Sequence, residues 1–427
     1  MRHVILAFLV VMALIAYVQR AAISVPLEEI GRDLAVANPT WALGLLQSAW
    51  QLGYAVCQLP SGGVADRFGA RRTVICLAVL WSLATGLTAF APSYWSVVAA
   101  WTAMGVLQAG AFPCAVRTIG RTFGDLERAR ASGWLGAGMF AGGAIAPVLT
   151  AWLLQRFAGP AAAAGLSPWR LCLATYALPG FAWAAVYWLA SRGTAADDKP
   201  AAAATPTAST DSPSRVSWGQ AFADPSLQLL CSQQFLRAGA MVFFITWFPT
   251  FLRETRGVSL MQSGLLTTYA GAASLLGAIL GGYASDQVLV RTGSKRLARQ
   301  GLATIGMAAC SALMAASLFV SDVNGAIALI SVGAFVATFG GVAGYTVAID
   351  YGGERVGTVF GAMNTAGNLG AMLFPVTIGW LVSATGTWNA ALVAFVVMMA
   401  VDAVLWAVLN PQHTFLAGPT PATAEPA

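Results

Sequence analysis

Long apolar runs recur along the whole 427-residue chain, separated by short stretches that hold charged residues, Gly and Pro. A run of about 20 apolar residues is long enough for one helix to cross the hydrocarbon core of a bilayer. Because backbone groups in lipid must be satisfied within their own segment, each run predicts a transmembrane helix. The twelve predicted spans lie near residues 4–30, 42–61, 73–92, 94–116, 131–155, 171–190, 226–251, 260–283, 301–321, 324–349, 358–384 and 389–409.

The composition agrees with an all-α membrane protein. Hydrophobic residues make up 58% of the chain and charged residues 9%, whereas soluble domains have about 45–50% and about 25%. So few charged groups cannot cover the surface of a soluble globule. An ordinary soluble enzyme and a secreted disulfide scaffold are therefore excluded.

Signals of catalysis and metal binding are missing from the sequence. The six cysteines lie within apolar runs without metal-ligand spacing, and the two histidines lie near the termini. The chain contains no P-loop, no GxSxG and no HExxH motif. We therefore expect no enzyme activity, no cofactor and no metal site.

The distribution of positive charge predicts the topology. With both termini on one side, sixteen of the 23 Lys and Arg residues fall on that side and five on the other. The positive-inside rule then places the N- and C-termini in the cytoplasm, for a multi-pass protein of the cell (inner) membrane. The net charge of +6 is explained by this topology, and we expect no nucleic-acid partner. The remaining two arginines, Arg20 and Arg237, lie inside predicted spans.

The chain divides into two similar parts. Residues 191–224 are rich in Ala, Pro, Thr and Ser, which predicts a flexible cytoplasmic linker between six-helix halves at 1–190 and 225–410. Residues 411–427 predict a disordered tail. The loop GGVADRFGARR after the second span has a weaker copy, GGYASDQVLVRTGSKR, after the eighth. Two pseudo-symmetric halves of this kind would rock about a site at the bilayer midplane.

The first of these loops resembles the loop signature of the major facilitator superfamily, G-x-x-x-D-R-x-G-R-R. The match covers Gly62 to Arg72 with one departure, at the expected loop. The resemblance implies twelve helices and transport by alternating access. It also implies a gating role for Asp66, Arg67, Gly69, Arg71 and Arg72. A loop that serves only to set the topology is the alternative.

Several segments are similar to the anion:cation symporter branch, which transports sugar acids and related organic anions. They lie at residues 17–20, 53–60, 109–113, 246–252 and 364–375. In that branch an acid precedes the arginine of span one, and another precedes the Ala-x-x-Phe-Pro segment of span four. Here Gln19 and Gln108 stand at these positions, so the proton carriers that the resemblance implies are absent there.

Arg20 and Arg237 are the candidate ligands of an anion. A charge near the bilayer centre costs about 2.5–3.5 kcal/mol on insertion scales, so it persists only beside a cavity or a partner. No carboxylate is close in sequence to either arginine. A guanidinium fits a carboxylate with two parallel hydrogen bonds. The alternative is a structural arginine bonded to backbone carbonyls at a helix break.

Polar side chains in spans two, four, seven and eleven are candidate contacts for substrate hydroxyl groups. Gln47, Gln51, Tyr54 and Gln58 fall on one face of span two, and a polar face in lipid must look into a cavity or another helix. Hydrogen bonding between helices without substrate contact is the alternative. The candidates for substrate binding are Tyr54, Gln51, Gln108, Gln234, Asn364 and Asn368.

Asp402 is the only carboxylate well inside a predicted span. It is a candidate proton site, although pairing with another helix or reaching toward the inner surface would also explain it. A proton or a sodium ion is the candidate coupling ion.

We therefore predict a secondary active transporter, expected to be a monomer in the lipid bilayer, that moves a small organic anion such as a sugar acid, by ion-coupled symport. A facilitator or exchanger without proton coupling is the first alternative. A drug/proton antiporter of the same fold is the second.

Overall fold

The computed structural model describes residues 1–23, 25–36, 39–192 and 223–410, and every regular element in this part is helical. Most of the predicted linker and the whole predicted tail lie outside these residues. The first group of helices, which we call the N-terminal half, comprises α1 (Arg2–Ala21), α2 (Leu27–Asp33), α3 (Pro39–Phe68), α4 (Ala70–Ala89), α5 (Tyr94–Gln108), α6 (Ala111–Thr122), α7 (Arg128–Ala163) and α8 (Pro168–Ala190). The second, the C-terminal half, comprises α10 (Pro225–Thr246), α11 (Phe248–Arg256), α12 (Leu260–Thr292), η1 (Arg296–Gly301), α13 (Leu302–Ser317), α14 (Val323–Gly341), α15 (Ala343–Gly352), η2 (Gly353–Arg355), α16 (Val356–Thr385) and α17 (Trp388–Val408).

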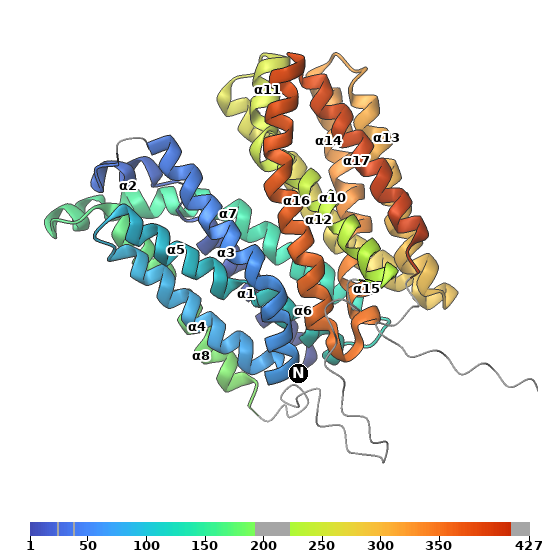
Figure 1. Cartoon of the computed structure of the whole chain (residues 1–427), viewed down its shortest axis with the longest axis horizontal. Coiled ribbons are helices and arrows are strands. Elements are labelled where there is room, and N and C mark those ends of the chain that lie inside the picture. Colours follow the sequence, from blue (N-terminus) through green and yellow to red (C-terminus); the bar gives the residue numbers. More distant parts are fainter. Residues whose placement is uncertain (24, 37–38, 193–222, 411–427) are drawn as a thin grey trace, which may run out of the picture.

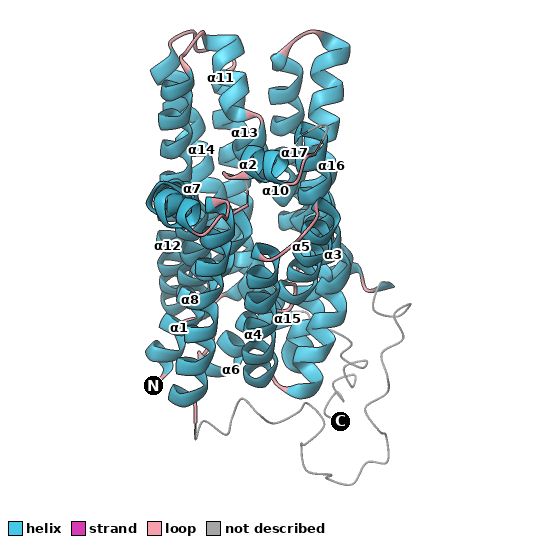
Figure 2. Ribbon diagram, turned by 90° about the vertical axis from the view of Figure 1, so that its left-hand side faces the viewer, coloured by secondary structure: helices cyan, strands magenta, loops and turns pink. Residues whose placement is uncertain are grey.

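The two halves form separate bundles that meet at one end. In Figure 1 the blue-to-green helices of the N-terminal half and the yellow-to-red helices of the C-terminal half converge near the N-terminus and diverge toward α2 and α11. Figure 2 shows the long helices running between these two ends. We call the end with the N-terminus, α6 and α15 the closed end, and the end with α2 and α11 the open end.

The prediction that the chain crosses a membrane several times is confirmed. Nine helical stretches among the described residues are long and apolar enough to cross a membrane, and one of them, Val323–Thr385, spans 63 residues and covers α14 to α16. The chain is thus a multi-pass membrane protein.

The first predicted span differs from the structure. We expected one helix over residues 4–30, but α1 ends at Ala21 and a separate short helix begins at Leu27. Pro26 precedes this second helix, and a proline disfavours helical backbone in the residue before it. Arg20 consequently lies in the last turn of α1 and not in the middle of a continuous helix.

Small residues allow the halves to pack closely along two helix pairs, α3 with α16 and α7 with α12. A Cβ atom built on Gly361 would lie 2.7 Å from the carbonyl oxygen of Gln58, and one on Gly282 would lie 2.5 Å from that of Ala129. Such distances are too short for carbon against oxygen. Glycine at these positions therefore allows close backbone approach between the halves.

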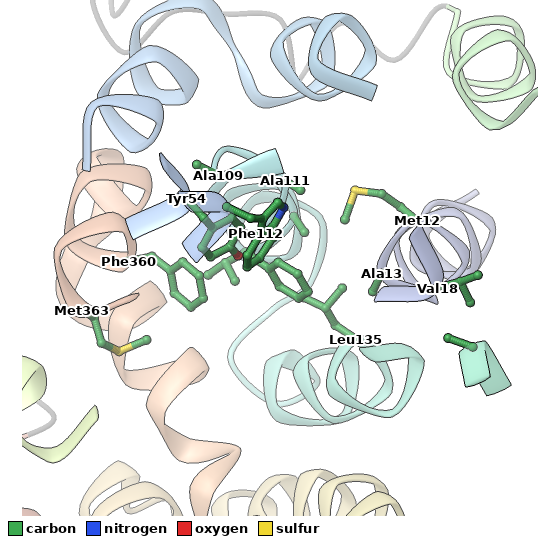
Figure 3. Packing of buried hydrophobic residues seen from close by; sticks show 14 of the residues in the cluster. Met12, Ala13, Val18, Tyr54, Ala109, Ala111, Phe112, Leu135, Phe360 and Met363 are labelled. Atoms are coloured by element: carbon green, nitrogen blue, oxygen red, sulfur yellow. The ribbon is translucent and has the colours of Figure 1, made fainter. Parts of the chain in front are cut away.

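An apolar layer seals the interface above the closed end. Figure 3 shows Tyr54 and Phe112 of the N-terminal half together with Phe360 and Met363 of α16. All four side chains are buried, at 3% exposure or less. Along α16, Phe360 and Met363 fall between the closed-end residue Gly357 and the polar residue Asn364. The layer thus separates polar groups at the closed end from those farther up.

Candidate functional site

Aromatic rings surround Arg20. The guanidinium carbon lies 4.3 Å from the ring centroids of Tyr17 and Trp50 and 4.5 Å from that of Tyr54. Tyr17 precedes Arg20 by one helical turn, while Trp50 and Tyr54 come from one face of α3 and stack on each other. Tyr17 and Trp50 were not among the predicted site residues. We call these four residues the aromatic box.

The aromatic box compensates only part of the arginine's charge. A desolvated cation–π contact is worth about 0.5–2 kcal/mol, and no acid forms an ion pair with Arg20 within the described residues. Its Nε is buried and has no hydrogen-bond partner there. The predicted alternative, an arginine bonded to backbone carbonyls, is not what the described contacts show. Arg20 therefore keeps donor capacity for another acceptor.

Arg237 occupies a different environment in the C-terminal half. Its Nη2 donates a hydrogen bond to Oε1 of Gln234, one turn earlier on α10. A Cβ atom built on Gly341 would lie 2.6 Å from Nη1, and one on Gly344 would lie 3.3 Å from Nη2. The side chain thus reaches across to the break between α14 and α15, where glycines leave room for it. The Nε is buried without a partner among the described atoms.

Tyr345 connects the two arginine environments. Its phenol interacts electrostatically with Arg237 and also with Tyr17 and Tyr54 of the aromatic box. The two arginines therefore flank one common region between the halves. Tyr345 was not predicted, although a tyrosine beside the glycines of an apolar span was a visible signal.

The predicted polar face of α3 pairs with α16. Nε2 of Gln51 donates to Oδ1 of Asn368 over 2.7 Å, and Nδ2 of Asn364 donates to Oε1 of Gln58 over 3.4 Å. Nδ2 of Asn368 also donates to the carbonyl of Asn364 over 2.8 Å. In this arrangement these residues hydrogen-bond between helices, and their contact with a substrate stays a prediction. The side chain of Gln47 lies outside the described residues.

The two amides at the positions of the expected acids face other helices. Nε2 of Gln19 donates to the carbonyl of Tyr176 over 2.7 Å, and Nε2 of Gln108 donates to that of Ala16 over 3.3 Å. Both side chains are buried at 1% exposure. The amide N–H groups make these two hydrogen bonds, which an ionised carboxylate cannot make. The substrate contact of Gln108 stays a prediction.

At the closed end, Asp66 binds the start of a helix in the other half. Its carboxylate accepts hydrogen bonds from the backbone N–H of Gly357 over 3.0 Å and from that of Thr358 over 2.8 Å. It also pairs with the guanidinium of Arg117, which in turn donates to the carbonyl of Glu354 over 2.6 Å. Negative charge at a helix N-terminus is stabilising. Arg117 was missed because its partners, Asp66 and Glu354, lie in two segments that are distant from it in the sequence.

The weaker sequence copy makes the same contact with the halves exchanged. Asp286 of α12 accepts hydrogen bonds from the backbone N–H of Ala129 over 3.2 Å and from that of Arg130 over 2.9 Å, at the N-terminus of α7. It pairs with Arg299 over 3.1 Å. The internal repeat in the sequence contained this signal, although neither residue was predicted. We call the two arrangements, around Asp66 and around Asp286, the carboxylate clamps.

The other predicted gating residues have different roles in this arrangement. Gly69 has a φ of 89° immediately before α4, a conformation that favours glycine. Arg71 donates to Oγ of Ser191 over 2.6 Å and so ties α4 to the end of α8 within one half. Arg67 and Arg72 are exposed.

A third group of charges joins the halves at the closed end. Lys295 pairs with Asp125 over 2.5 Å, and Arg128 pairs with Asp350 over 2.6 Å. The hydrogen bond from Lys295, together with the nearby charge of Arg128, holds the pKa of Asp125 below its ordinary value. Asp125 is therefore ionised at neutral pH.

Several known transporters are similar to this chain in sequence. The chain is 30% identical to a probable sulfoacetate transporter of Cupriavidus necator, over 97% of this chain and 95% of the relative. It is 27% identical to a D-galactonate transporter of Escherichia coli, over 90% of each chain. It is 24% identical to a hexuronate transporter of Bacillus subtilis, over 91% of this chain and 89% of the relative.

Two solved structures share the fold at low sequence identity. The transporter FucP in its outward conformation matches with a TM-score of 0.74 and 15% identity, over 95% of this chain and 98% of that one. The proton:xylose symporter XylE matches with a TM-score of 0.72 and 16% identity, over 97% of each. The model of the Major Facilitator Superfamily matches residues 9–375. With its helices, its carboxylate clamps and these relatives, the chain belongs to the Major Facilitator Superfamily of transporters, which are not enzymes.

Proposed function

We propose that this protein carries a small organic anion across the cell (inner) membrane by alternating access. One observation carries the proposal: two arginines, one in each half, face a common region without a carboxylate in direct contact among the described side chains. The two halves, 1–190 and 225–410, would then rock about this region as twelve spans with both termini in the cytoplasm. The closed end would be the cytoplasmic side.

The cost of burying the charge of Arg20 favours an anionic substrate. The cost of a charge near the bilayer centre is about 2.5–3.5 kcal/mol. Each ring of the aromatic box offsets about 0.5–2 kcal/mol of it, but neutral rings leave the positive charge itself without a counter-charge. A carboxylate that binds the guanidinium of Arg20 adds charge-assisted hydrogen bonds to the interactions that the phenols of Tyr17 and Tyr54 already make with it. A drug/proton antiporter would instead place an acid where this chain has arginine.

The relatives narrow the class of anion. Their names specify sulfoacetate, D-galactonate and hexuronates, and a carboxylate is the group that these compounds share. Tyr54 lies against Arg20, and Gln234 lies against Arg237. We propose that these two side chains bond additional oxygen atoms of the substrate, either hydroxyl groups or a second acidic group.

Alternating access requires the contacts between the halves to break. The carboxylate clamps and the pairs between Gln51 and Asn368 and between Gln58 and Asn364 join the halves in this arrangement. When the closed end opens, we propose that the four amides lose their partners and face the passage. Asn364 and Asn368 would then be available to substrate hydroxyl groups.

Counterflow in proteoliposomes tests the proposal. Vesicles loaded with unlabelled sulfoacetate, D-galactonate or D-glucuronate are diluted into the same labelled compound, and exchange is measured for the wild type, Arg20→Gln and Arg253→Gln. Arg253 is an exposed arginine at the end of α11, so its variant is the matched control. Loss of hydrogen bonds to a charged group costs about 1.5–3 kcal/mol, or about 10–100-fold in exchange.

We expect this loss in Arg20→Gln and full exchange in the control. If Arg20→Gln exchanges anions at the wild-type rate, or if the wild type exchanges none of the three compounds, the anion proposal is wrong.

A further inference from the structure

Asp402 is a buried carboxyl group without a hydrogen-bond partner. It lies on α17 at 0% exposure, and neither of its oxygen atoms makes a hydrogen bond within the described residues. An isolated ionised carboxylate in an apolar interior is very costly, and such a group takes up a proton unless a cation compensates it. The charge state of Asp402 therefore depends on whether neighbouring side chains supply a positive charge.

The helices packed against α17 supply one cation that acts on Asp402. From α10, Arg237 interacts with it electrostatically, and from α13 the Cys310 thiol does so. Helix α16 carries no titratable residue. The arginines of η1 have other partners, because Arg296 donates to Gln300 and Arg299 pairs with Asp286.

Arg237 and Asp402 attract each other without direct contact. No ion pair within 4.0 Å joins them in the described structure, although each affects the other electrostatically. The guanidinium is held toward Gln234 and toward the space at Gly341 and Gly344. One cation thus interacts both with a buried acid and with Tyr345, in the region where we place the anion.

We propose that Asp402 binds a proton and that Arg237 couples this proton to the transported anion. When an anion bound in the region between the two arginines offsets the charge of Arg237, Asp402 loses its compensating charge and takes up a proton. When the anion leaves, Arg237 again favours the ionised form of Asp402, and the proton is released. This inference rests on the proposed function and extends it to the coupling ion.

Thermodynamic linkage between proton binding and anion binding fixes the direction in which pH changes the anion affinity. The anion and the ionised carboxylate compete for one guanidinium, so protonation of Asp402 must raise anion affinity by the same factor by which the anion favours protonation. Apparent anion affinity is therefore high at low pH and falls, by up to about tenfold per pH unit, as Asp402 loses its proton. A proton site on α17 also explains how symport proceeds with Gln19 and Gln108 in place of acids.

Two measurements on the full-length protein test the coupling. Infrared difference spectroscopy between about pH 5 and about pH 9 detects the C=O stretch of a protonated buried carboxyl group without any substrate. In parallel, labelled sulfoacetate, D-galactonate and D-glucuronate are followed in proteoliposomes, by counterflow and by accumulation driven by an imposed pH gradient. Asp402→Asn is compared with Asp322→Asn, a control at the exposed N-cap of α14, where asparagine also caps well.

We expect the carboxyl band in the wild type and in Asp322→Asn, and its loss in Asp402→Asn. We also expect Asp402→Asn to keep counterflow within about threefold and to lose gradient-driven accumulation by at least about tenfold. If the band persists in Asp402→Asn, or if this variant still accumulates anion from the pH gradient, the coupling role is wrong. If the band behaves as expected but no anion exchanges in the wild type, the proton site stands and the assignment of an anionic substrate fails.

Discussion

Buried arginines at two levels of this molecule have opposite surroundings. At the closed end, the side chains of Arg117 and Arg299 are fully buried, and each pairs with a carboxylate, Asp66 and Asp286 respectively. In the central region, Arg20 lies among aromatic rings and Arg237 beside an amide and two glycines, with no acid in direct contact among the described side chains. The comparison separates arginines that pair with a carboxylate of the protein from arginines for which we propose a carboxylate of the substrate as the partner.

Neutralising an acid at the closed end should have the largest effect. In Asp66→Asn the buried Arg117 loses its carboxylate, and breaking a buried ion pair in this way costs about 3–5 kcal/mol. We expect the closed end to separate. Spin labels at the exposed Phe68 and Leu297, one on each half, should report a longer distance. Asp286→Asn should act in the same direction, since it removes the other carboxylate clamp.

An unchanged label distance in both variants would show that packing of glycines and apolar side chains holds the closed end together without the clamps.

Replacing each central arginine by lysine compares the two arginine environments directly. Lysine keeps the charge but loses the planar fork that matches a carboxylate. Arg20 has rings as neighbours, so the anion supplies most of its acceptors, and we expect Arg20→Lys to lose about 100-fold in counterflow. Arg237 already donates to Gln234, and we expect a loss of about tenfold in Arg237→Lys, at the low end of the range for charged hydrogen bonds. Equal losses would contradict the distinction between the two environments.

Glycine substitutions beside Arg237 should have graded, smaller effects. A Cβ on Gly341 would lie 2.6 Å from Nη1 and displace the guanidinium, whereas a Cβ on Gly344 would lie 3.3 Å from Nη2 and need only a slight shift. We expect Gly341→Ala to lower counterflow by about tenfold and Gly344→Ala by about threefold or less, as for displaced and retained charged hydrogen bonds. The reverse order would mean that Arg237 is not held at the helix break.

Lowering the pH at the closed end should have the smallest effect. The pKa of Asp125 lies below its ordinary value because of its hydrogen bond from Lys295 and the charge of Arg128. A group with a lowered pKa stabilises the paired state above its unpaired pKa and loses this contribution as pH falls through the lowered value. We expect the label distance between Phe68 and Leu297 to change slightly below about pH 4. Asp125→Asn should show the low-pH distance already at neutral pH.

The sequence predicted the class of protein because its physical basis is local. Twelve apolar runs, the charge bias and the loop at Gly62–Arg72 depend only on neighbours along the chain. The sequence also identified both central arginines, since a charge inside an apolar run is visible without a structure. It failed at the end of α1, where a continuous helix was expected.

The partners of the polar residues could not be predicted in the same way. Helical periodicity placed Gln51 and Tyr54 on one face of α3, but that face meets two surroundings: Gln51 bonds Asn368, whereas Tyr54 lies against Arg20. The same limit hid Arg117 and Asp286, because each has a partner in the other half of the chain as well as one in its own half.

By itself, then, the sequence determined that this is a polytopic helical transporter with two arginines inside its predicted spans. The tertiary structure alone decided which charges are satisfied by the protein, because that depends on which helices of the two halves pack together. Hydrophobic periodicity determines the direction in which a side chain points from its helix. Only the packing of segments that are distant in sequence determines which groups that side chain contacts.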